Sequence, residues 1–583
     1  MIELFHFSPR PNRAAEIDWH LWDEATFAKA QRSDKPILLA ISAVWCHWCH
    51  VMDETSYSDS AVIAYLNEHF VPIRIDNDQR PDINARYNMG GWPTTVVLTP
   101  NGTTLTGATY LPPQQLLAML REILTFYREN KTQIEQRQAQ LAAAIKPPVP
   151  GRTERFEAPA GDHGDSIVAP IVEELRAGYD SEYGGFGTQP KFPQTPALEF
   201  LLLEYRLTGE ASLYEMVAKT MLSMARGGMY DHVEGGYFRY STTRDWSVPH
   251  FEKMTEDHAG LLRVLAILVT ISRNPEFRPT LASATSYIMT TLRDEATGLF
   301  GGSQDADEAY FALPLEERRT MSAPYVDRTS YSNWTAALAG SFFAVSSAMD
   351  DPRIAQRAMH ALDRLHERVR DEDGLLYHFV VPGGQPQVRG LLTDQAAYLR
   401  ALLDAHQHTG EARFFERARE LVPAIDKRLG AAQGGYYDHA ALHGELGNLS
   451  LKDRPMHDNA LIADSLLRLA ALTDEPQYRE RAQTTLAVFA DTYAKAGWFA
   501  AGYVSAVRRY RSDSSVLCIV GEVQESAALR EAAMRLPDPL LCVRTIDPRS
   551  DTRVPGAYLC RGVTCAPPVV SAADLGEAFA AIR

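Results

Sequence analysis

Cysteines and long apolar runs are scarce in this 583-residue chain. Six cysteines are too few for the disulfide framework of a small secreted protein. A membrane-spanning helix needs roughly 20 apolar residues, and the longest apolar stretch, from Leu261 to Ile271, contains Arg263. The first residues, Met1 to Trp19, lack the apolar core of a signal peptide. These features predict a cytoplasmic protein that makes no contact with a membrane.

Positively charged residues are fewer than negatively charged ones. Lys and Arg number 58 against 74 Asp and Glu, which gives a formal net charge of −16. An acidic protein of this kind is a poor partner for nucleic acid or an anionic membrane surface. The length predicts two or three domains, and 45% apolar with 23% charged residues is an ordinary globular composition.

Two of the six cysteines stand close together where an apolar run, Ile37 to Ser42, gives way to the sequence Trp45-Cys46-His47-Trp48-Cys49-His50. Two residues between the cysteines allow the thiols to close into a disulfide. If a helix begins here, its free backbone N–H groups and its dipole favour a thiolate at Cys46, and such pairs have lowered thiol pKa values. The pattern predicts Cys46 as the nucleophile and Cys49 as the resolving thiol. Supporting residues would be Trp45, His47, Trp48 and His50.

Other chemistries use related patterns. Cys-x-x-Cys-His attaches c-type haem, which requires an export signal. Thiolates and histidines also ligate zinc, but His47 and Cys49 lie within one helical turn of Cys46 and would not all converge. Two merely buried cysteines are a poor match for a pair that starts a helix. We therefore expect a redox-active disulfide with no further cofactor, and zinc remains the minor alternative.

The sequence after the cysteine pair predicts a thioredoxin-like order of elements. The pattern indicates a helix at Ser60–His69, a strand at Phe70–Ile75, a short helix at Asp82–Met89, strands at Thr94–Thr99 and Thr103–Tyr110, and a long helix at Pro112–Ala144. The Pro100-Asn101-Gly102 turn between the last two strands is a strong hairpin signal. Pro93, just before the third core strand, matches the cis proline that shapes substrate access in that fold. Trp92 precedes it.

Four motifs of this region resemble the spermatogenesis-associated-protein-20-like family: Lys35-Pro36-Ile37, the Cys-His-Trp-Cys-His-Val-Met run, Arg80-Pro81-Asp82 and Gly90-Gly91-Trp92-Pro93. The resemblance implies a thioredoxin domain followed by a large helical domain. One position departs from thioredoxin itself, because the buried aspartate that aids proton transfer to the second cysteine would fall at Ala40. Attack by Cys49 on a mixed disulfide then lacks an internal base.

A repeating pattern follows a Pro- and Gly-rich linker. Gly-rich aromatic turns recur at residues 183–186, 235–238, 299–302, 374–377, 434–437 and, more weakly, 497–502, with amphipathic helical stretches between them. Self-similarity of this kind is typical of a repeat architecture. Six helical hairpins predict a closed (α/α)6 toroid, and an open helical solenoid is the alternative.

The expected domain boundaries follow from these patterns. We predict a thioredoxin-like domain at 1–145, a linker at 146–165, the six-hairpin toroid at 166–512 and a small α/β segment at 513–583. In the last segment Cys560 and Cys565 are expected to be two reduced thiols in a structural turn.

The family resemblance continues into the toroid, through Pro190-Lys191-Phe192-Pro193, Gly227-Gly228-Met229-Tyr230-Asp231, the run 245–254 and Ser303-Gln304-Asp305-Ala306-Asp307. It frays after Asp307, and residues 309–334 are short and divergent. Related six-hairpin barrels include sugar 2-epimerases and unsaturated-uronyl hydrolases, which implies a pocket at the barrel mouth. The candidates for that pocket are Lys191, Asp231, His232, Arg239, Tyr240, Asp245, Trp246, His250, Glu252, Lys253, Asp257, Asp305, Asp307 and His439.

These patterns support three functional hypotheses. The leading one is thiol–disulfide exchange at Cys46 and Cys49 with a protein partner, the toroid binding the substrate or partner. The second is a sugar-processing toroid, either an epimerase with two histidine acid/base groups or a hydrolase with a carboxyl pair drawn from Glu252, Asp305 and Asp307. The third is a non-catalytic scaffold, in which the glycine turns and the charged run 249–254 only brace the helices. The sequence does not identify the substrate, the redox direction or the oligomeric state.

Overall fold

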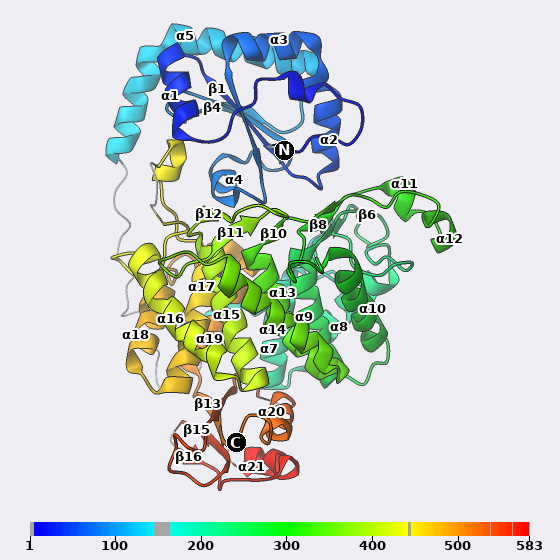
Figure 1. Ribbon diagram of the computed structural model, residues 1–583, viewed down its shortest axis with the longest axis vertical. Helices are drawn as coiled ribbons and strands as arrows, with labels where there is room; N and C mark the ends of the chain where they lie inside the picture. The colour runs from blue at the N-terminus through cyan, green and yellow to red at the C-terminus, as the bar shows by residue number, and fades with distance from the viewer. Residues whose placement is uncertain (1–4, 145–163, 441–444, 537, 563, 582–583) are drawn as a thin grey trace. The chain divides into compact units, whose positions relative to one another are not determined.

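A computed structural model describes residues 5–144, 164–440, 445–536, 538–562 and 564–581 (Figure 1). Contacts divide the chain into two compact units. One unit comprises Met1–Val149 with Gln304–Ala306 and Ala441–Asp453, and the other comprises the remaining residues. The expected linker at 146–165 lies, up to residue 163, outside the described residues.

The N-terminal unit is built on a four-stranded sheet of order β2-β1-β3-β4. Its strands are β1 (Ile37–Ser42), β2 (Val71–Asp76), β3 (Thr94–Leu98) and β4 (Thr104–Ala108). Strand β1 is parallel to β2 and antiparallel to β3, which pairs antiparallel with β4. The helices are α1 (Glu24–Ser33), α2 (His47–Glu54), α3 (Ser60–His69), α4 (Pro81–Tyr87) and α5 (Pro113–Ala144). This order confirms the predicted thioredoxin-like fold.

Both faces of this sheet are buried, since side chains alternate along each strand. Leu38 and Val97 pack on one side with Leu66 of α3 and the apolar residues of α5. Ile37, Leu39, Ile41 and Val96 pack on the other side with residues of α1 and α4. Strand β1 is therefore apolar at nearly every position and ends just before the cysteine pair.

The second unit is dominated by a ring of helices. Within the described residues the inner ring consists of α7 (Thr195–Thr208), α9 (Thr255–Ile271), α13 (Ser332–Met349), α15 (Leu392–Thr409), α17 (Met456–Thr473) and α19 (Ala501–Arg511). Each inner helix contacts the next, and α19 contacts α7. The outer helices are α6 (Asp165–Gly178), α8 (Ala211–Arg226), α10 (Phe277–Tyr287), α14 (Pro352–Arg368), α16 (Ala412–Leu429) and α18 (Pro476–Ala487). The ring is closed, so the predicted toroid is confirmed and the open solenoid is excluded.

The glycine-rich turns that reveal the repeat share one backbone geometry. At Asp180, Asp231 and Asp294 the aspartate carbonyl accepts a hydrogen bond from the N–H four residues later, at 2.8–2.9 Å. Glycine is required in these turns: Gly236 has φ +85°, and a Cβ there would lie 2.6 Å from the Tyr287 ring. Each turn follows an outer helix and redirects the chain toward the next inner helix.

The C-terminal segment is a small α/β layer, red in Figure 1. It contains β13 (Ser515–Val520), α20 (Ala527–Met534), β14 (Cys542–Ile546), β15 (Gly556–Arg561), β16 (Thr564–Cys565) and α21 (Leu575–Ala581). The sheet order β14-β13-β15-β16, with one parallel and two antiparallel pairings, repeats the connectivity of the N-terminal sheet.

The expectation of two reduced thiols in this segment is wrong. Cys560 and Cys565 form a disulfide with a Cα–Cα distance of 4.0 Å. They are directly opposite each other on β15 and β16, a register that brings the two side chains together on one face of the ladder.

None of the helices in the described ranges combines the length and apolar character needed to cross a bilayer.

Candidate functional site

The cysteine pair lies where β1 ends and α2 begins, as the sequence predicts. Cys46 is the N-cap of α2, and its Sγ accepts a hydrogen bond from the Cys49 N–H at 3.2 Å. The Cys46 carbonyl accepts from the N–H groups of Cys49 and His50 at 3.0 and 3.1 Å. A backbone donor aimed at sulfur and the positive end of the helix dipole both favour a thiolate on the first cysteine.

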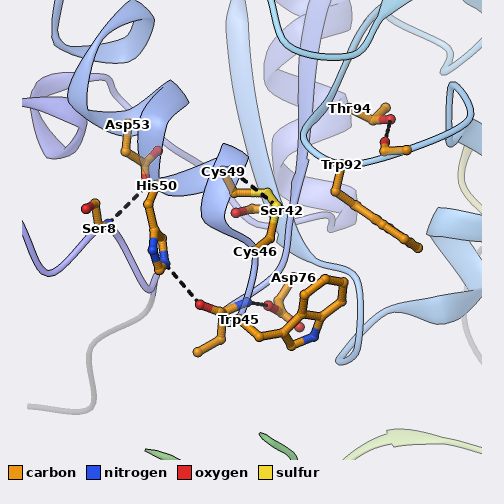
Figure 2. The surroundings of a disulfide bond; sticks show 12 residues. Ser8, Ser42, Trp45, Cys46, Cys49, His50, Asp53, Asp76, Trp92 and Thr94 are labelled. Carbon is orange, nitrogen blue, oxygen red and sulfur yellow. Dashed lines mark hydrogen bonds between the residues drawn. A yellow bond between two sulfur atoms is a disulfide. The ribbon is translucent and has the colours of Figure 1, made fainter. Parts of the chain in front are cut away.

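The two sulfurs are joined in a disulfide with a Cα–Cα distance of 5.2 Å. Cys46 is 5% exposed and Cys49 is 2% exposed. Figure 2 shows the pair with Trp45 and Trp92 to one side and His50 to the other. Both cysteines are thus largely covered, and Cys46 is slightly more exposed than Cys49.

Tryptophans frame the disulfide. Trp45 is buried, its Nε1 donates to Asp78 Oδ2 at 2.6 Å, and its ring meets the Trp92 ring edge-on with centroids 5.6 Å apart. The Trp92–Pro93 peptide bond is cis, which confirms the geometry predicted for Pro93. Trp48, in contrast, is 48% exposed, and an exposed indole beside a dithiol offers apolar surface to a partner protein.

The two histidines of the motif differ. His50 is half-buried, and burial together with the nearby His6 lowers its pKa to about 4. Its Nε2 lies 3.0 Å from the Val44 carbonyl, so the neutral ring donates this hydrogen bond and orients the start of α2. His47 is also half-buried, with its ring edge-on to Trp48 at 5.9 Å.

A buried ion pair supports the far end of α2. Arg74 of β2 donates two hydrogen bonds to Asp53, at 2.8 and 2.9 Å, and both side chains are almost fully buried. The Ser8 N–H donates to the same carboxylate at 3.1 Å. Arg74 pairs with Ala40 in the sheet register, at the position where thioredoxin carries its buried aspartate. The Asp53 carboxylate is thus engaged by Arg74 and by the Ser8 backbone.

Three of the predicted pocket residues of the toroid, Lys191, Asp231 and Lys253, form buried ion pairs that brace its turns. Lys191 Nζ lies 2.9 Å from Asp180, and Lys253 Nζ lies 2.7 Å from Asp231, with both lysines fully buried. Burial lowers the pKa of Lys253 to about 8, against the attraction of Asp231. Asp231 also binds Arg318 at 2.8 Å, an arginine from the divergent region that the sequence left unassigned.

A second set of candidates forms local contacts. His250 Nδ1 lies 2.9 Å from Glu252, whose hydrogen bond raises the pKa of His250, and the imidazole stacks on Tyr240 at 4.8 Å. Trp246 Nε1 donates to the Tyr183 carbonyl, 63 residues away in the sequence. The remaining candidates have partners close by in the sequence: His232 lies 3.1 Å from the Gly227 carbonyl, His439 lies near the Ala440 carbonyl, Asp245 accepts from Ser247, and Asp307 caps a short helix, α11 (Glu308–Phe311). Asp305 belongs by its contacts to the N-terminal unit.

A cavity of about 820 Å³ runs through the toroid. Of the predicted candidates, Arg239 and Asp257 line it. At the end where the inner helices begin, the lining also includes residues that the sequence did not single out, among them Glu256, Asn333, Trp334, Thr393, His457 and Asp458. This volume lies in the range of small-molecule sites.

A feature shared by the starts of three inner helices identifies two of these residues. The fourth residue of three inner helices, His258, Gln395 and Asn459, accepts a hydrogen bond from a turn backbone N–H at 2.7–2.9 Å. These bonds set the helix starts in register. The residues just before them are therefore equivalent aspartates, of which Asp257 and Asp458 line the cavity.

Two of the aspartates that line the cavity, Asp257 and Asp458, have raised pKa values. Burial raises the pKa of Asp257 to about 7, with Arg239 opposing and Glu256 reinforcing the shift. Burial also raises the pKa of Asp458 to about 7, reinforced by the neighbouring Asp394. Strongly perturbed carboxyls in a cavity are candidates for binding or proton transfer.

Deeper in the cavity the charges are neutralised within the protein. Asp404 binds Arg263 and Arg468 at 2.9 and 2.8 Å. Arg400 binds Glu199 at 2.9 Å. This half of the cavity is an internal ion-pair network.

Sequence comparison places the chain among known proteins. A family model described as "Thioredox_DsbH: Protein of unknown function, DUF255" matches residues 10–146. Human spermatogenesis-associated protein 20 is 25% identical over 710 aligned residues, covering 96% of this chain and 89% of the human protein. Its mouse counterpart is 34% identical over 314 residues, covering 50% of this chain and 39% of the mouse protein. The predicted resemblance to the spermatogenesis-associated-protein-20-like family is confirmed.

Comparison with solved structures concerns the toroid. Cellobiose 2-epimerase from Spirochaeta thermophila is 14% identical with a TM-score of 0.50, covering 60% of this chain and 96% of that one. Cellobiose 2-epimerase from Bacillus thermoamylovorans is 11% identical with a TM-score of 0.48, covering 60% of this chain and 98% of that one. At such an identity the Spirochaeta likeness shows the fold alone, a closed ring of six helical hairpins.

Proposed function

We propose that the N-terminal unit carries out thiol–disulfide exchange through Cys46 and Cys49. The observation that carries this proposal is the position of Cys46 Sγ at the first turn of α2, 3.2 Å from the Cys49 backbone N–H. That position favours a thiolate on the first sulfur, and the second sulfur is close enough to close the disulfide.

The proposed thiol–disulfide exchange takes two steps, and atoms and electrons balance in each. The Cys46 thiolate attacks one sulfur of a partner disulfide, forming a mixed disulfide and releasing the other partner sulfur as a thiolate. Cys49, after losing its proton, attacks the Cys46 sulfur and releases the second partner thiolate. Two electrons pass from the dithiol to the partner, and the reverse sequence oxidises a partner dithiol.

Proton transfer sets a limit on the second step. Ala40 stands where thioredoxin has its buried aspartate, and Asp53 is held by Arg74. The Cys49 proton then leaves to solvent or to the partner. We therefore infer that resolution of the mixed disulfide accelerates with pH more steeply than in a protein with an internal base.

The partner we propose is a protein carrying a thiol or disulfide. The exposed Trp48 ring, 5.2 Å from the Tyr110 ring, supports a protein partner over a small thiol. Aromatic side chains are enriched where proteins bind one another.

The test is the reduction potential of the pair, measured in glutathione buffers with alkylation and peptide-resolved mass analysis. Peptide resolution is needed because Cys560 and Cys565 form a second disulfide. We expect a two-electron couple between about −120 and −270 mV. A Cys49→Ser variant should trap a mixed disulfide that Cys46→Ser does not. A pair that never closes, or equal trapping by both variants, would refute the proposal.

A second candidate function is sugar processing in the toroid. One observation favours it, the cavity of about 820 Å³ lined by carboxyl groups and an indole. The named activities of the structural neighbours, 2-epimerisation of cellobiose among them, give it a direction. A third candidate, a non-catalytic scaffold, gains support if neither the cysteines nor the cavity residues change any ligand binding.

A further inference from the structure

The inner helices begin around one end of the cavity and offer it a defined set of side chains. Their second residues all line the cavity, namely Pro196, Glu256, Asn333, Thr393, His457 and Gly502. Third residues that line it are Asp257, Trp334 and Asp458. The second position of every inner helix and the third position of α9, α13 and α17 thus face the cavity.

Asp257 and Asp458 stand on opposite walls. The inner ring runs α7, α9, α13, α15, α17 and α19 among the described residues, and α19 returns to α7. Helix α9, which carries Asp257, is separated from α17, which carries Asp458, by two helices on either side. Since both residues are at the third position, they lie at the same level of the cavity.

A third aspartate at the same level, Asp394, has a structural role and serves as a comparison. Asp394 at the start of α15 is fully buried and accepts from His378 Nδ1 at 2.9 Å. Asp257 has no such partner, and its buried Oδ2 is without a hydrogen bond within the described residues. A buried carboxyl oxygen left without a partner is costly unless a proton, water or ligand satisfies it.

We propose that this end of the toroid binds a neutral polyhydroxylated molecule, with Asp257 and Asp458 hydrogen-bonded to its hydroxyl groups from opposite sides. The inference rests on the second candidate function and specifies its ligand contacts. It is independent of the cysteine pair.

The chemistry of the lining favours this class of ligand. Arg239 and Glu256 carry opposite charges, and the aspartates are neutral when protonated, so neither a strong cation nor a strong anion is complementary. Asn333 and Thr393 add amide and hydroxyl groups, which give the mixed donors and acceptors that hydroxyls require. The Trp334 ring adds an apolar face for the C–H surface of a ring-shaped polyol.

The direct test is binding of glucose, mannose, maltose and cellobiose to the full chain by calorimetry and saturation-transfer NMR. We expect at least one of these probes to bind with a dissociation constant in the millimolar range or below. Asp257→Ala and Asp458→Ala should each weaken that binding at least tenfold. Glu416→Gln, an exposed change on α16, is the matched control, and Cys46→Ser should bind like the wild type.

The pH profile separates ligand contact from a structural role. Wild-type affinity should change between pH 6 and 8, and Asp257→Asn or Asp458→Asn should flatten that change. If the alanine variants fail to fold, the asparagine variants and the wild-type profile decide. The inference is overturned if none of the four sugars binds at 50 mM, if a polyamine such as spermidine binds instead, or if affinity is indifferent to both aspartates.

Discussion

Replacing Arg74 with methionine should destabilise the helix that carries the cysteine pair. The Arg74 and Asp53 side chains are 4% and 1% exposed. Removing one partner of a buried pair leaves an uncompensated charge at a cost of about 3–5 kcal/mol. Methionine keeps apolar bulk next to Phe7, over which the guanidinium now lies at 4.7 Å. The loss of the charge partner therefore dominates.

Hydrogen exchange of α2 measures this change locally, which suits a chain with more than one folding unit. A cost of about 3–5 kcal/mol increases the open population by roughly 10²-fold to several thousandfold. Arg13→Met is the control, since its pair with Glu16 is about half exposed and is worth less than about 1 kcal/mol. Adding Asp53→Leu to Arg74→Met should restore much of the protection. Exchange within a few-fold of wild type, or a double variant no better than the single one, would refute the reasoning.

Other predictions concern the second unit. Asp231→Asn should cost about 3–5 kcal/mol, because buried Lys253 loses its carboxylate and Arg318 keeps only Glu234. Lys253→Met should cost clearly less. Hydrogen exchange of the 229–241 backbone compares the two variants, and equal effects would contradict the ion-pair account. Burial raises the pKa of Asp458 to about 7, so the folded chain binds more protons than the unfolded chain between about pH 4 and 7. Stability therefore falls as the pH rises through that window. Asp458→Asn should flatten the dependence of the melting temperature on pH there, and an unchanged pH profile would count against this assignment. Reducing the Cys560–Cys565 disulfide should lower the stability of β15 and β16 by about 2 kcal/mol, the value expected for the small loop that it closes. Reductant should therefore speed hydrogen exchange in these strands of the wild type and have no such effect on Cys560→Ser.

Local chemistry explains why much of the N-terminal unit could be predicted from the sequence. Helix α3 spans Ser60–His69, as predicted, because Asp59 caps its first turn. The turn at Gly102, with φ +86°, joins β3 to β4 at the predicted place. The position of Pro93 before β3 was sufficient to predict its cis bond. Each of these features depends on a few adjacent residues.

The toroid cavity could not be predicted in the same way. Its lining comes from helix starts as far apart as Glu256 and Asp458, and only ring closure brings them together. The conspicuous motifs around Lys191 and Lys253 did not indicate residues that line the cavity, because both lysines form buried ion pairs that brace turns. Aligning helix starts, and not only glycine turns, would have singled out the aspartates. Trp334 was harder to find, because it ends the divergent stretch.

The closure of the ring has a consequence for the order in which the chain can fold. Helix α7 contacts α19, and Arg508 of α19 donates to buried Glu204 of α7 at 2.9 and 2.6 Å. During synthesis the first inner helix is made some 300 residues before the helix that completes its surroundings, and contacts of such separation form late. A ribosome therefore releases the strands and helices of residues 1–149 long before the toroid can finish, whereas the 441–453 segment of the same unit is made much later. Until Arg508 emerges, Glu204 and the apolar face of α7 remain exposed. This exposed surface of α7 is the part of the incomplete ring that a chaperone would most need to cover.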